Sequence, residues 1–380
     1  MELSEIRKEI DGIDSSLVKL VTERLKRSLD VAKVKCEGTI NPTVYVKERE
    51  DEILERLTAG LVGSEAKAVV EVYKKLLVNS RALQYVYAVD NEKVSLDEDE
   101  LTSDPETNTF TTLVCQGIEG AYSSIAAREF IKKGGERYIK FVKNFEDVFK
   151  AIDDDTLGVL PLENSTAGSV GEVYDLFLKY GLYIVKSYDL SIRHCLLANK
   201  DATLDSIKSV TAHPQALMQC SSFIVERELN MVNAVNNAVA SKEVSESGRV
   251  DIAAISAKEN AKLYSLKVLS EDINNSLMNT TRFVLVSNKL MVPKSGGKVS
   301  LVFSLENSSG TLANVLNIFS AYSLSMSKIE SRPLESEKWA YRFYVDIEGN
   351  IRDRKVRAML YQLKKELPFV RLLGSYDAVE

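Results

Sequence analysis

The sequence has few cysteines, few histidines and no long apolar run, and each shortage excludes a class of protein. Its four cysteines lie far apart without a C-x-x-C pair, and only two histidines occur among 380 residues. A disulfide scaffold or a metal centre is therefore not expected. No run reaches the ~18 apolar residues of a membrane span, and the charged residues at 2–11 leave no room for a signal peptide. We expect a cytoplasmic protein without metal, cofactor or membrane contact.

The sequence also has no excess of positive charge, because it contains 49 basic and 55 acidic residues and its net charge is −6. A nucleic-acid partner is therefore not expected. The acidic excess lies in residues 89–109, which contain eight acidic residues and one basic residue and are typical of a solvated linker. At roughly 150 residues per domain, the length predicts two or three domains. We expect domains at 1–90, 110–290 and 299–380, with a linker at 91–109.

The first segment has the pattern of long helices. Apolar residues alternate three and four positions apart, which places them on one stripe of a helix: Leu3, Ile6, Ile10, Ile13, Leu17 and Leu20. A helix over 3–36 would be about 50 Å long at 1.5 Å per residue, too long to fold back on itself in so small a domain. We expect it to pack against a partner subunit. Two further helices are predicted near 48–57 and 65–88.

The second and third segments have different patterns. Strand-like runs alternate with helical stretches in the second segment, which predicts an α/β domain; the runs are 111–117, 138–142, 157–164, 182–187, 251–256 and 281–287. From residue 299 onward the order is strand, helix opening at Gly310, two strands, helix and strand. This βαββαβ order is that of the ferredoxin-like, split-βαβ unit.

Polar side chains on the helices of the first segment allow two interpretations. They lie on or beside faces that should be dry: Arg7, Arg24, Lys35, Glu48, Ser80 and Gln84. In the simpler interpretation the segment is a dimerisation domain whose long cationic side chains extend to water. In the other, buried cations need anionic partners, and few carboxylates are available, so the cations would bind a small dianion.

The second segment has two turns rich in small polar residues, at 117–124 and 160–170, and we expect each to follow a strand and open a helix. Backbone N–H groups and hydroxyls at helix starts bind carboxylates, although such residues also serve as caps alone. His213 with Pro214 is typical of a helix start. His194 has the pattern of a strand histidine whose hydrogen bonds are satisfied.

Together, the residues of the first segment resemble the substrate-site pattern of the all-helical chorismate mutases. That family converts chorismate to prephenate by a rearrangement that needs no nucleophile. Such an enzyme holds the substrate in its compact conformation and stabilises the charge on the breaking ether oxygen. The resemblance implies that Arg7, from the other subunit, and Arg24 bind the carboxylates. It places Lys35 and Gln84 at the ether oxygen and Glu48 and Ser80 around the hydroxyl, and it includes Lys47 among the substrate-binding residues.

The motifs G-x-x-G-A-Y-S, P-L-E-N-S, R-H-C-L-L, A-H-P-Q-A-L-x-Q-C and T-R-F occur in this order and resemble the prephenate dehydratases over 110–290. The resemblance implies a periplasmic-binding-protein-like domain of two subdomains. It also implies loss of water and carbon dioxide from prephenate, with Thr281 as the catalytic residue. We expect Thr281 to donate a hydrogen bond to the leaving hydroxyl. Candidate substrate contacts are Ser123, Asn164, Ser165, Gln215, Arg282 and Phe283.

The third segment contains two short motifs that resemble the phenylalanine-binding motifs of the ACT regulatory domain, although turn chemistry alone also explains them. Their residues are Gly310, Thr311, Leu312, Glu330, Ser331 and Arg332, and Thr311 adds a hydroxyl where alanine is more usual. The resemblance implies feedback inhibition by L-phenylalanine bound between paired domains.

The whole chain thus resembles the bifunctional chorismate mutase/prephenate dehydratases of phenylalanine biosynthesis. We expect a homodimer or homotetramer that acts as an isomerase and a lyase. Two alternatives stay open on the residues alone. One is a dehydratase that prefers arogenate and uses the helices for dimerisation, and the other is an amino-acid sensor without enzymatic activity.

Overall fold

The computed structural model describes residues 2–99, 110–132, 137–294, 297–306, 308–333 and 341–379, and the chain divides into two units. Unit 1 joins Met1–Thr102 to Val292–Ser375, and unit 2 comprises Ser103–Met291 with Tyr376–Glu380. No helix in the described ranges is long and apolar enough to cross a membrane.

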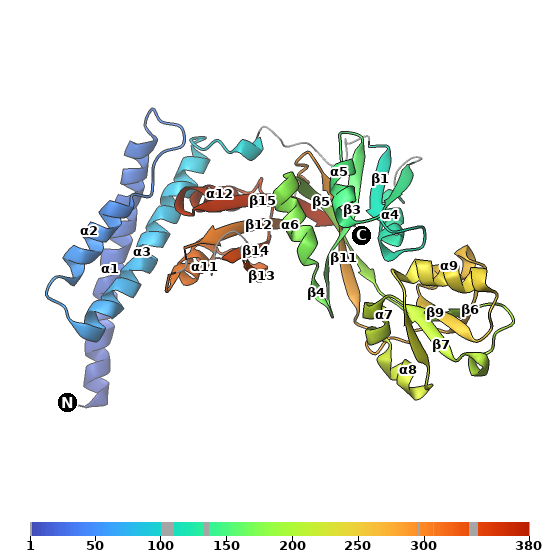
Figure 1. Cartoon of the computed structure of the whole chain (residues 1–380). Coiled ribbons are helices and arrows are strands. Elements are labelled where there is room, and N and C mark those ends of the chain that lie inside the picture. The colour runs from blue at the N-terminus through green and yellow to red at the C-terminus, as the bar shows by residue number, and fades with distance from the viewer. Residues whose placement is uncertain are drawn as a thin grey trace. The chain divides into compact units, whose positions relative to one another are not determined.

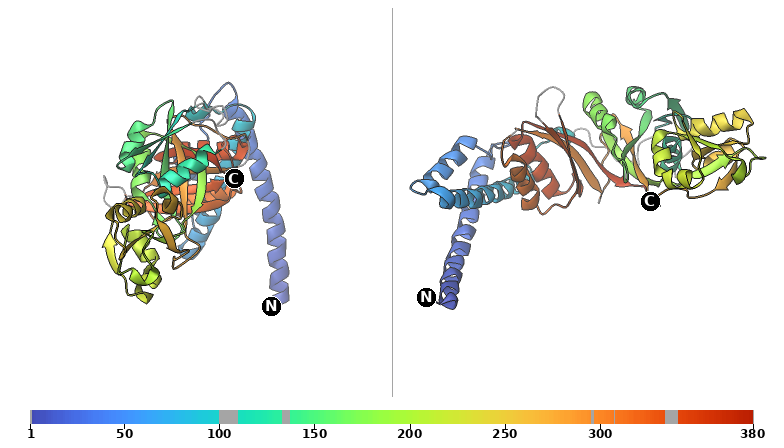
Figure 2. Two further views of the ribbon diagram at one scale, coloured as in Figure 1. Left: turned by 90° about the vertical axis from the view of Figure 1, so that its right-hand side faces the viewer. Right: turned by 60° about the horizontal axis from the view of Figure 1, so that its bottom comes forward.

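Unit 1 begins with three helices, α1 (Leu3–Cys36), α2 (Lys47–Thr58) and α3 (Gly63–Asp90), so the helices predicted from periodicity are confirmed. The C-terminal part of α1 packs on α3 and buries Ala32 and Cys36. Its N-terminal part extends beyond α2 and α3 (Figure 1, Figure 2). There the apolar stripe is exposed on this chain, with Leu3 at 64% and Ile13 at 60%.

The rest of unit 1 follows the βαββαβ order expected from the sequence. Its elements are β12 (Lys298–Leu305), α11 (Thr311–Ala321), β13 (Met326–Pro333), β14 (Tyr341–Glu348), α12 (Arg354–Glu366) and β15 (Phe369–Ala378). The strands lie in the order β13-β14-β12-β15, with β13 at an edge. Helices α11 and α12 both pack on α3 (Figure 1), and the rings of Tyr85 and Tyr361 meet edge to face at 5.5 Å.

Unit 2 has two lobes, each built on a sheet (Figure 1). The larger lobe orders its strands β5-β11-β3-β1-β2; they are β1 (Thr112–Gln116), β2 (Tyr138–Val142), β3 (Thr156–Asn164), β5 (Tyr183–Ser191) and β11 (Thr280–Ser287). Its helices are α4 (Tyr122–Ile131), α5 (Phe145–Ala151) and α6 (Gly171–Tyr180). Strands β2, β1 and β3 are parallel, and β11 runs antiparallel between β3 and β5.

The smaller lobe orders its strands β10-β6-β9-β7-β8; they are β6 (Cys195–Ala198), β7 (Ser209–Ala212), β8 (Asn230–Asn233), β9 (Ile252–Ser256) and β10 (Lys267–Ser270). Four helices accompany them, α7 (Pro214–Gln219), α8 (Ser221–Glu226), α9 (Asn237–Ser247) and α10 (Glu259–Leu263). The alternating pattern of the sequence therefore corresponds to two sheets, and the chain passes between the lobes at 192–194 and at 271–279.

One local expectation was wrong. The turn at 160–170 does not open a helix directly, because β3 first forms a hairpin with β4 (Gly168–Ser169), and α6 starts only at Gly171. Of the predicted solvated linker, 91–99 lie within the described residues and 100–109 lie outside them. In the described part Leu96 is buried, and Glu98 is buried because Lys364 donates to it at 2.8 Å.

Candidate active sites

Unit 2 contains a cleft of about 360 Å³ to which both lobes contribute. Five of the residues singled out from the sequence line it, namely Ser123, Asn164, Gln215, Thr281 and Phe283. Their elements explain the convergence, because β3 ends here and β11, α4 and α7 begin here. The helix start predicted at His213 is confirmed, since its ring accepts from the Gln215 N–H with Pro214 in the first turn.

Thr281 lies opposite Asn164 in the register of β11 and β3. The Asn164 amide Nδ2 donates to Thr281 Oγ1 at 2.9 Å, so the hydroxyl oxygen acts as an acceptor here. Among the described residues no atom accepts the hydroxyl proton of Thr281. That proton is therefore available to a ligand in the cleft.

Arg282 and Ser165 lie outside the lining of the cleft. Side chains alternate along a strand, so Arg282 is on the face of β11 opposite to Thr281 and Phe283. It pairs with Glu163 at 2.5 Å and Asp189 at 2.9 Å. Burial opposes its charge, but these carboxylates raise the pKa of Arg282 overall. Ser165 bonds the backbone of Met278 and Thr280 at the start of β11, so both residues hold the strand in place.

Several residues that line the cleft were missed as site residues, among them Tyr122, His194 and Gln219. The hydroxyl of Tyr122 lies 3.0 Å from His194 Nδ1, and His194 Nε2 lies 3.0 Å from Gln219 Oε1. His194 is 1% exposed, and burial lowers its pKa, so the imidazole is neutral. The sequence interpretation of a satisfied histidine is confirmed, but the ring also faces the cleft. His194 precedes β6, at a point where the chain passes between the lobes, and this position could have identified it as a site residue.

The helices of unit 1 bring together part of the second predicted site. Arg24 donates to Ser80 Oγ at 2.7 Å, and Ser80 and Gln84 are buried as expected. Gln84 Nε2 donates to the Ser80 carbonyl at 3.3 Å, while its Oε1 has no hydrogen-bond partner in the part of the chain that the structure describes. Lys35 donates to the Val44 carbonyl at 2.9 Å, and burial lowers its pKa.

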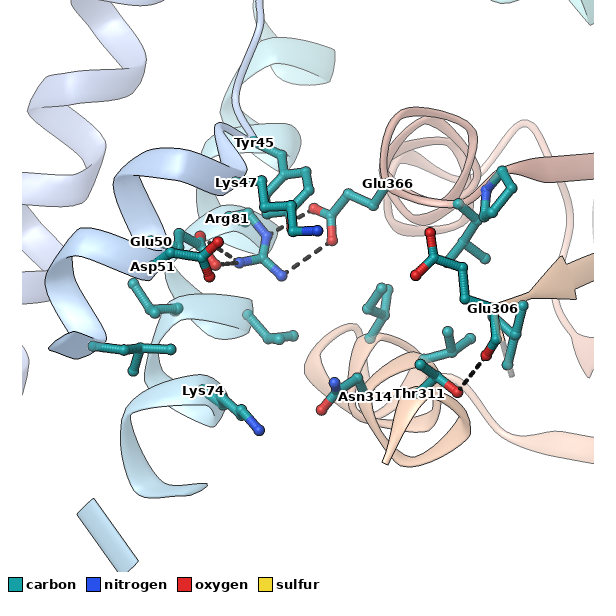
Figure 3. Close-up of a pocket in the computed structure, with 18 residues that line it drawn as sticks. Tyr45, Lys47, Glu50, Asp51, Lys74, Arg81, Glu306, Thr311, Asn314 and Glu366 are labelled. Atoms are coloured by element: carbon teal, nitrogen blue, oxygen red, sulfur yellow. Dashed lines mark hydrogen bonds and ion pairs between the residues drawn. The ribbon is translucent and has the colours of Figure 1, made fainter. Parts of the chain in front are cut away.

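Two further candidates of that site, Arg7 and Glu48, are exposed on this chain. Lys47 instead lines a separate pocket of about 430 Å³ within unit 1, between α2 and α3 on one side and α11 and α12 on the other (Figure 3).

The separate pocket is built around Arg81, which sequence reading did not single out. Its guanidinium binds Glu50 and makes two bonds to Glu366, at 2.7 and 3.0 Å (Figure 3). Burial raises the pKa of Glu366, and Arg81 partly offsets this. Glu366 lies 285 residues away from Arg81 along the chain, so no local pattern could have connected them.

The candidate effector residues fall into two groups. Gly310, Thr311 and Leu312 line a hollow of about 330 Å³ that Tyr341 and Phe343 also line. Gly310 has φ of +86°, a conformation that favours glycine. The Thr311 hydroxyl bonds the carbonyls of its own turn, Glu306 O at 3.1 Å and Ser308 O at 2.9 Å. The second group, Glu330, Ser331 and Arg332, lies on the edge strand β13 and outside that lining.

Two family models match the chain, in the order of its segments. The model of chorismate mutase type II matches residues 6–85, and that of prephenate dehydratase matches 113–290. The first model covers α1 to α3 with Arg24, Lys35, Ser80 and Gln84, and the second covers the two-lobed unit with Thr281. Helices and cleft thus define a mutase joined to a dehydratase.

Full-length relatives carry the same combination. The bifunctional chorismate mutase/prephenate dehydratase of Buchnera aphidicola subsp. Schizaphis graminum is 30% identical over 386 residues, 99% of this chain and 97% of the relative. The chain belongs to the family of bifunctional chorismate mutase/prephenate dehydratases. Arogenate dehydratase/prephenate dehydratase 1 of Arabidopsis thaliana is 35% identical over 279 residues, 69% of this chain and 70% of the relative.

Solved structures resemble about 70% of the chain. Prephenate dehydratase from Arthrobacter aurescens in complex with L-Phe is 28% identical with a TM-score of 0.63, covering 70% of this chain and 90% of that one. GqqA, described as a quorum-quenching acylase, is 29% identical with a TM-score of 0.63 and covers 70% and 98%.

Proposed function

We propose that this chain converts chorismate to prephenate in its helical segment and prephenate to phenylpyruvate in unit 2, two steps of phenylalanine biosynthesis. The observation that carries the dehydratase assignment is Thr281, whose hydroxyl accepts from Asn164 and keeps its proton for a ligand in the cleft. Family membership supports both activities. We assign 1–90 to the mutase, 91–109 to a linker, 110–290 to the dehydratase and 299–380 to regulation.

In the dehydratase step, loss of carbon dioxide leaves an electron pair that enters the ring and expels the ring hydroxyl. The departing oxygen gains negative charge, so a preorganised donor lowers the barrier. Thr281 supplies that donor. Ser123 at the start of α4 lies where backbone N–H groups are available to a carboxylate, and Gln215 lines the same cleft at the start of α7. Phe283 keeps water from the carboxylate that leaves.

In the mutase step, Arg24 would bind a carboxylate of the dianion, and Lys35 and Gln84 would act at the ether oxygen. We propose that a second copy of the chain completes this site with its Arg7 and that the protein is a homodimer or homotetramer. The exposed apolar stripe of α1 supports this, as does the Oε1 of Gln84, which has no hydrogen-bond partner among the described residues. We assign Glu48 to the same site, whereas the placement of Lys47 in another pocket argues against its role there.

We further propose that 299–380 form a ferredoxin-like ACT domain that binds L-phenylalanine and inhibits the enzyme. The strand order with β13 at an edge leaves a strand for pairing between two such domains. The similar Arthrobacter dehydratase structure contains L-Phe. Gly310, Thr311 and Leu312 would form one side of the effector site, and Glu330, Ser331 and Arg332 the other.

The experiment gives the purified protein chorismate and follows prephenate and phenylpyruvate separately, with and without L-phenylalanine. Thr281→Ala is expected to abolish phenylpyruvate formation and leave prephenate formation intact, and Lys35→Ala to do the reverse when prephenate is supplied. Product from both variants at wild-type rates would contradict the site assignments. Because the Arabidopsis relative is named for arogenate as well, arogenate is the second substrate to test, by comparing kcat/KM for the two compounds.

A further inference from the structure

A single chain of hydrogen bonds crosses the cleft of unit 2 and ends at Thr281. It runs through His194, Gln219, Thr166, Asn164 and Thr281, with donor–acceptor distances of 3.0, 3.1, 2.7 and 2.9 Å. Tyr122 adds a bond to the far side of the imidazole, at 3.0 Å. His194 and Gln219 border the smaller lobe, and the other three residues belong to the larger lobe.

Two backbone amides determine the direction of this chain. The N–H groups of Thr166 and Ala167 donate to Asn164 Oδ1 at 3.0 and 2.9 Å. A backbone N–H group can only donate, so the Asn164 side-chain atom that accepts from both must be its carbonyl oxygen. The side-chain nitrogen of Asn164 must therefore face Thr281. The 2.7 Å contact between Thr166 Oγ1 and Asn164 Oδ1 then requires the Thr166 proton.

The remaining members follow from that assignment. Since Thr166 gives its proton to Asn164, it must accept from Gln219, which places the Gln219 amide nitrogen at Thr166 and the oxygen at His194. The neutral imidazole therefore carries its proton on Nε2, and Nδ1 shares the Tyr122 hydroxyl proton with the Arg193 carbonyl oxygen, at 3.0 and 3.1 Å. Each donor along the chain points toward Thr281.

We propose that His194 and Gln219 are positioning residues for the dehydratase, and that they act through Thr166 and Asn164 to direct the Thr281 proton at the substrate. With its oxygen occupied as an acceptor, the Thr281 hydroxyl turns its hydrogen into the cleft. This inference rests on the proposed dehydratase function. Thr166 tests it most directly, because it is part of the chain but does not line the cleft.

Thr166→Val, which keeps shape and removes the hydroxyl, is expected to lower kcat for prephenate about tenfold, the effect of one lost hydrogen bond, with KM unchanged. Thr166→Ser is expected to restore kcat. Gln219→Met interrupts the same chain, so the double variant is expected to lose no more than the stronger single variant. Wild-type kcat in Thr166→Val, no rescue by serine, or multiplied losses in the double variant would each overturn the proposal.

Failure of the inference can be distinguished from failure of the proposed function. Wild-type protein that forms no phenylpyruvate from prephenate, or Thr281→Ala that forms it normally, would overturn the function and the inference together. Normal wild-type and Thr281→Ala results combined with an unaffected Thr166→Val would overturn the inference alone. Far-UV circular dichroism and an unchanged KM for prephenate report that unit 2 of each variant has folded, and mutase turnover of chorismate reports on unit 1.

Discussion

The ion-pair cluster around Arg81 predicts a large stability effect from one substitution. The side chains of Arg81 and Glu366 are 9% and 6% exposed, and that of Glu50 is 20% exposed. Arg81→Met keeps most of the apolar stem but leaves the Glu366 carboxylate buried without its counter-ion. Breaking a buried pair in this way costs about 3–5 kcal/mol. Because water partly solvates Glu50, we expect the free energy of unfolding of unit 1 to fall by about 3 kcal/mol at pH 7.

The same substitution has a pH dependence with a definite sign. Burial raises the pKa of Glu366 and Arg81 lowers it, so the pKa rises further in Arg81→Met. A carboxyl whose folded pKa exceeds its unfolded value contributes stability that is complete below the unfolded pKa and is lost as pH rises through the folded pKa. The deficit of the variant is therefore largest near neutral pH and shrinks as pH falls and Glu366 takes up a proton.

Urea unfolding at pH 7 and pH 5 measures this effect. Unfolding is monitored by far-UV circular dichroism and by the loss of mutase activity, which reports on unit 1. Arg249→Met is a matched control, since its pair with Asp251 is 57% and 38% exposed and a solvent-exposed pair contributes little to stability. Adding Glu366→Leu to Arg81→Met should recover most of the loss, because the uncompensated charge disappears. A loss below about 1 kcal/mol for Arg81→Met, or a deficit that grows at pH 5, would refute the reasoning.

Three further substitutions test other parts of the molecule. Thr311→Ala should leave L-phenylalanine affinity within about twofold, measured by calorimetry, because the hydroxyl is engaged by Glu306 O and Ser308 O; a large change would place that hydroxyl in the effector site. Ile13→Asp should weaken self-association in sedimentation velocity, since a charge in an apolar interface is costly, and an unchanged oligomer would count against the α1 stripe. Arg282→Met should lower the melting temperature of unit 2 and leave KM for prephenate within about twofold, whereas a tenfold rise in KM would mean that Arg282 reaches the substrate.

Periodicity predicted the elements well because burial imposes it directly. The expected helix over 3–36 matches α1 at Leu3–Cys36, and the run at 281–287 matches β11 at Thr280–Ser287. The alternation of side chains along a strand would also have corrected the predicted set of substrate contacts. Thr281 and Phe283 share one face of the strand, so Arg282 must lie on the other.

Contacts between distant segments could not be predicted, because no local pattern records them. Gln219 meets Thr166 across 53 positions, and Arg81 meets Glu366 across 285. Each partner looks ordinary in its own helix or turn. The burial of Glu98 within the predicted linker is of the same kind, since its carboxylate accepts from Lys364 near the other end of the chain.

The partners of the buried cations separate structural residues from ligand-binding ones. Arg81 and Arg282 each bind two carboxylates, so their charge is compensated within the protein. Arg24 bonds only a hydroxyl and Lys35 only a carbonyl among the described residues, and both are half-buried. A half-buried cation without a bonded carboxylate retains a positive potential that favours an anion. The positive charge left for a dicarboxylate therefore lies at Arg24 and Lys35, which explains how a chain of net charge −6 can bind an anionic substrate.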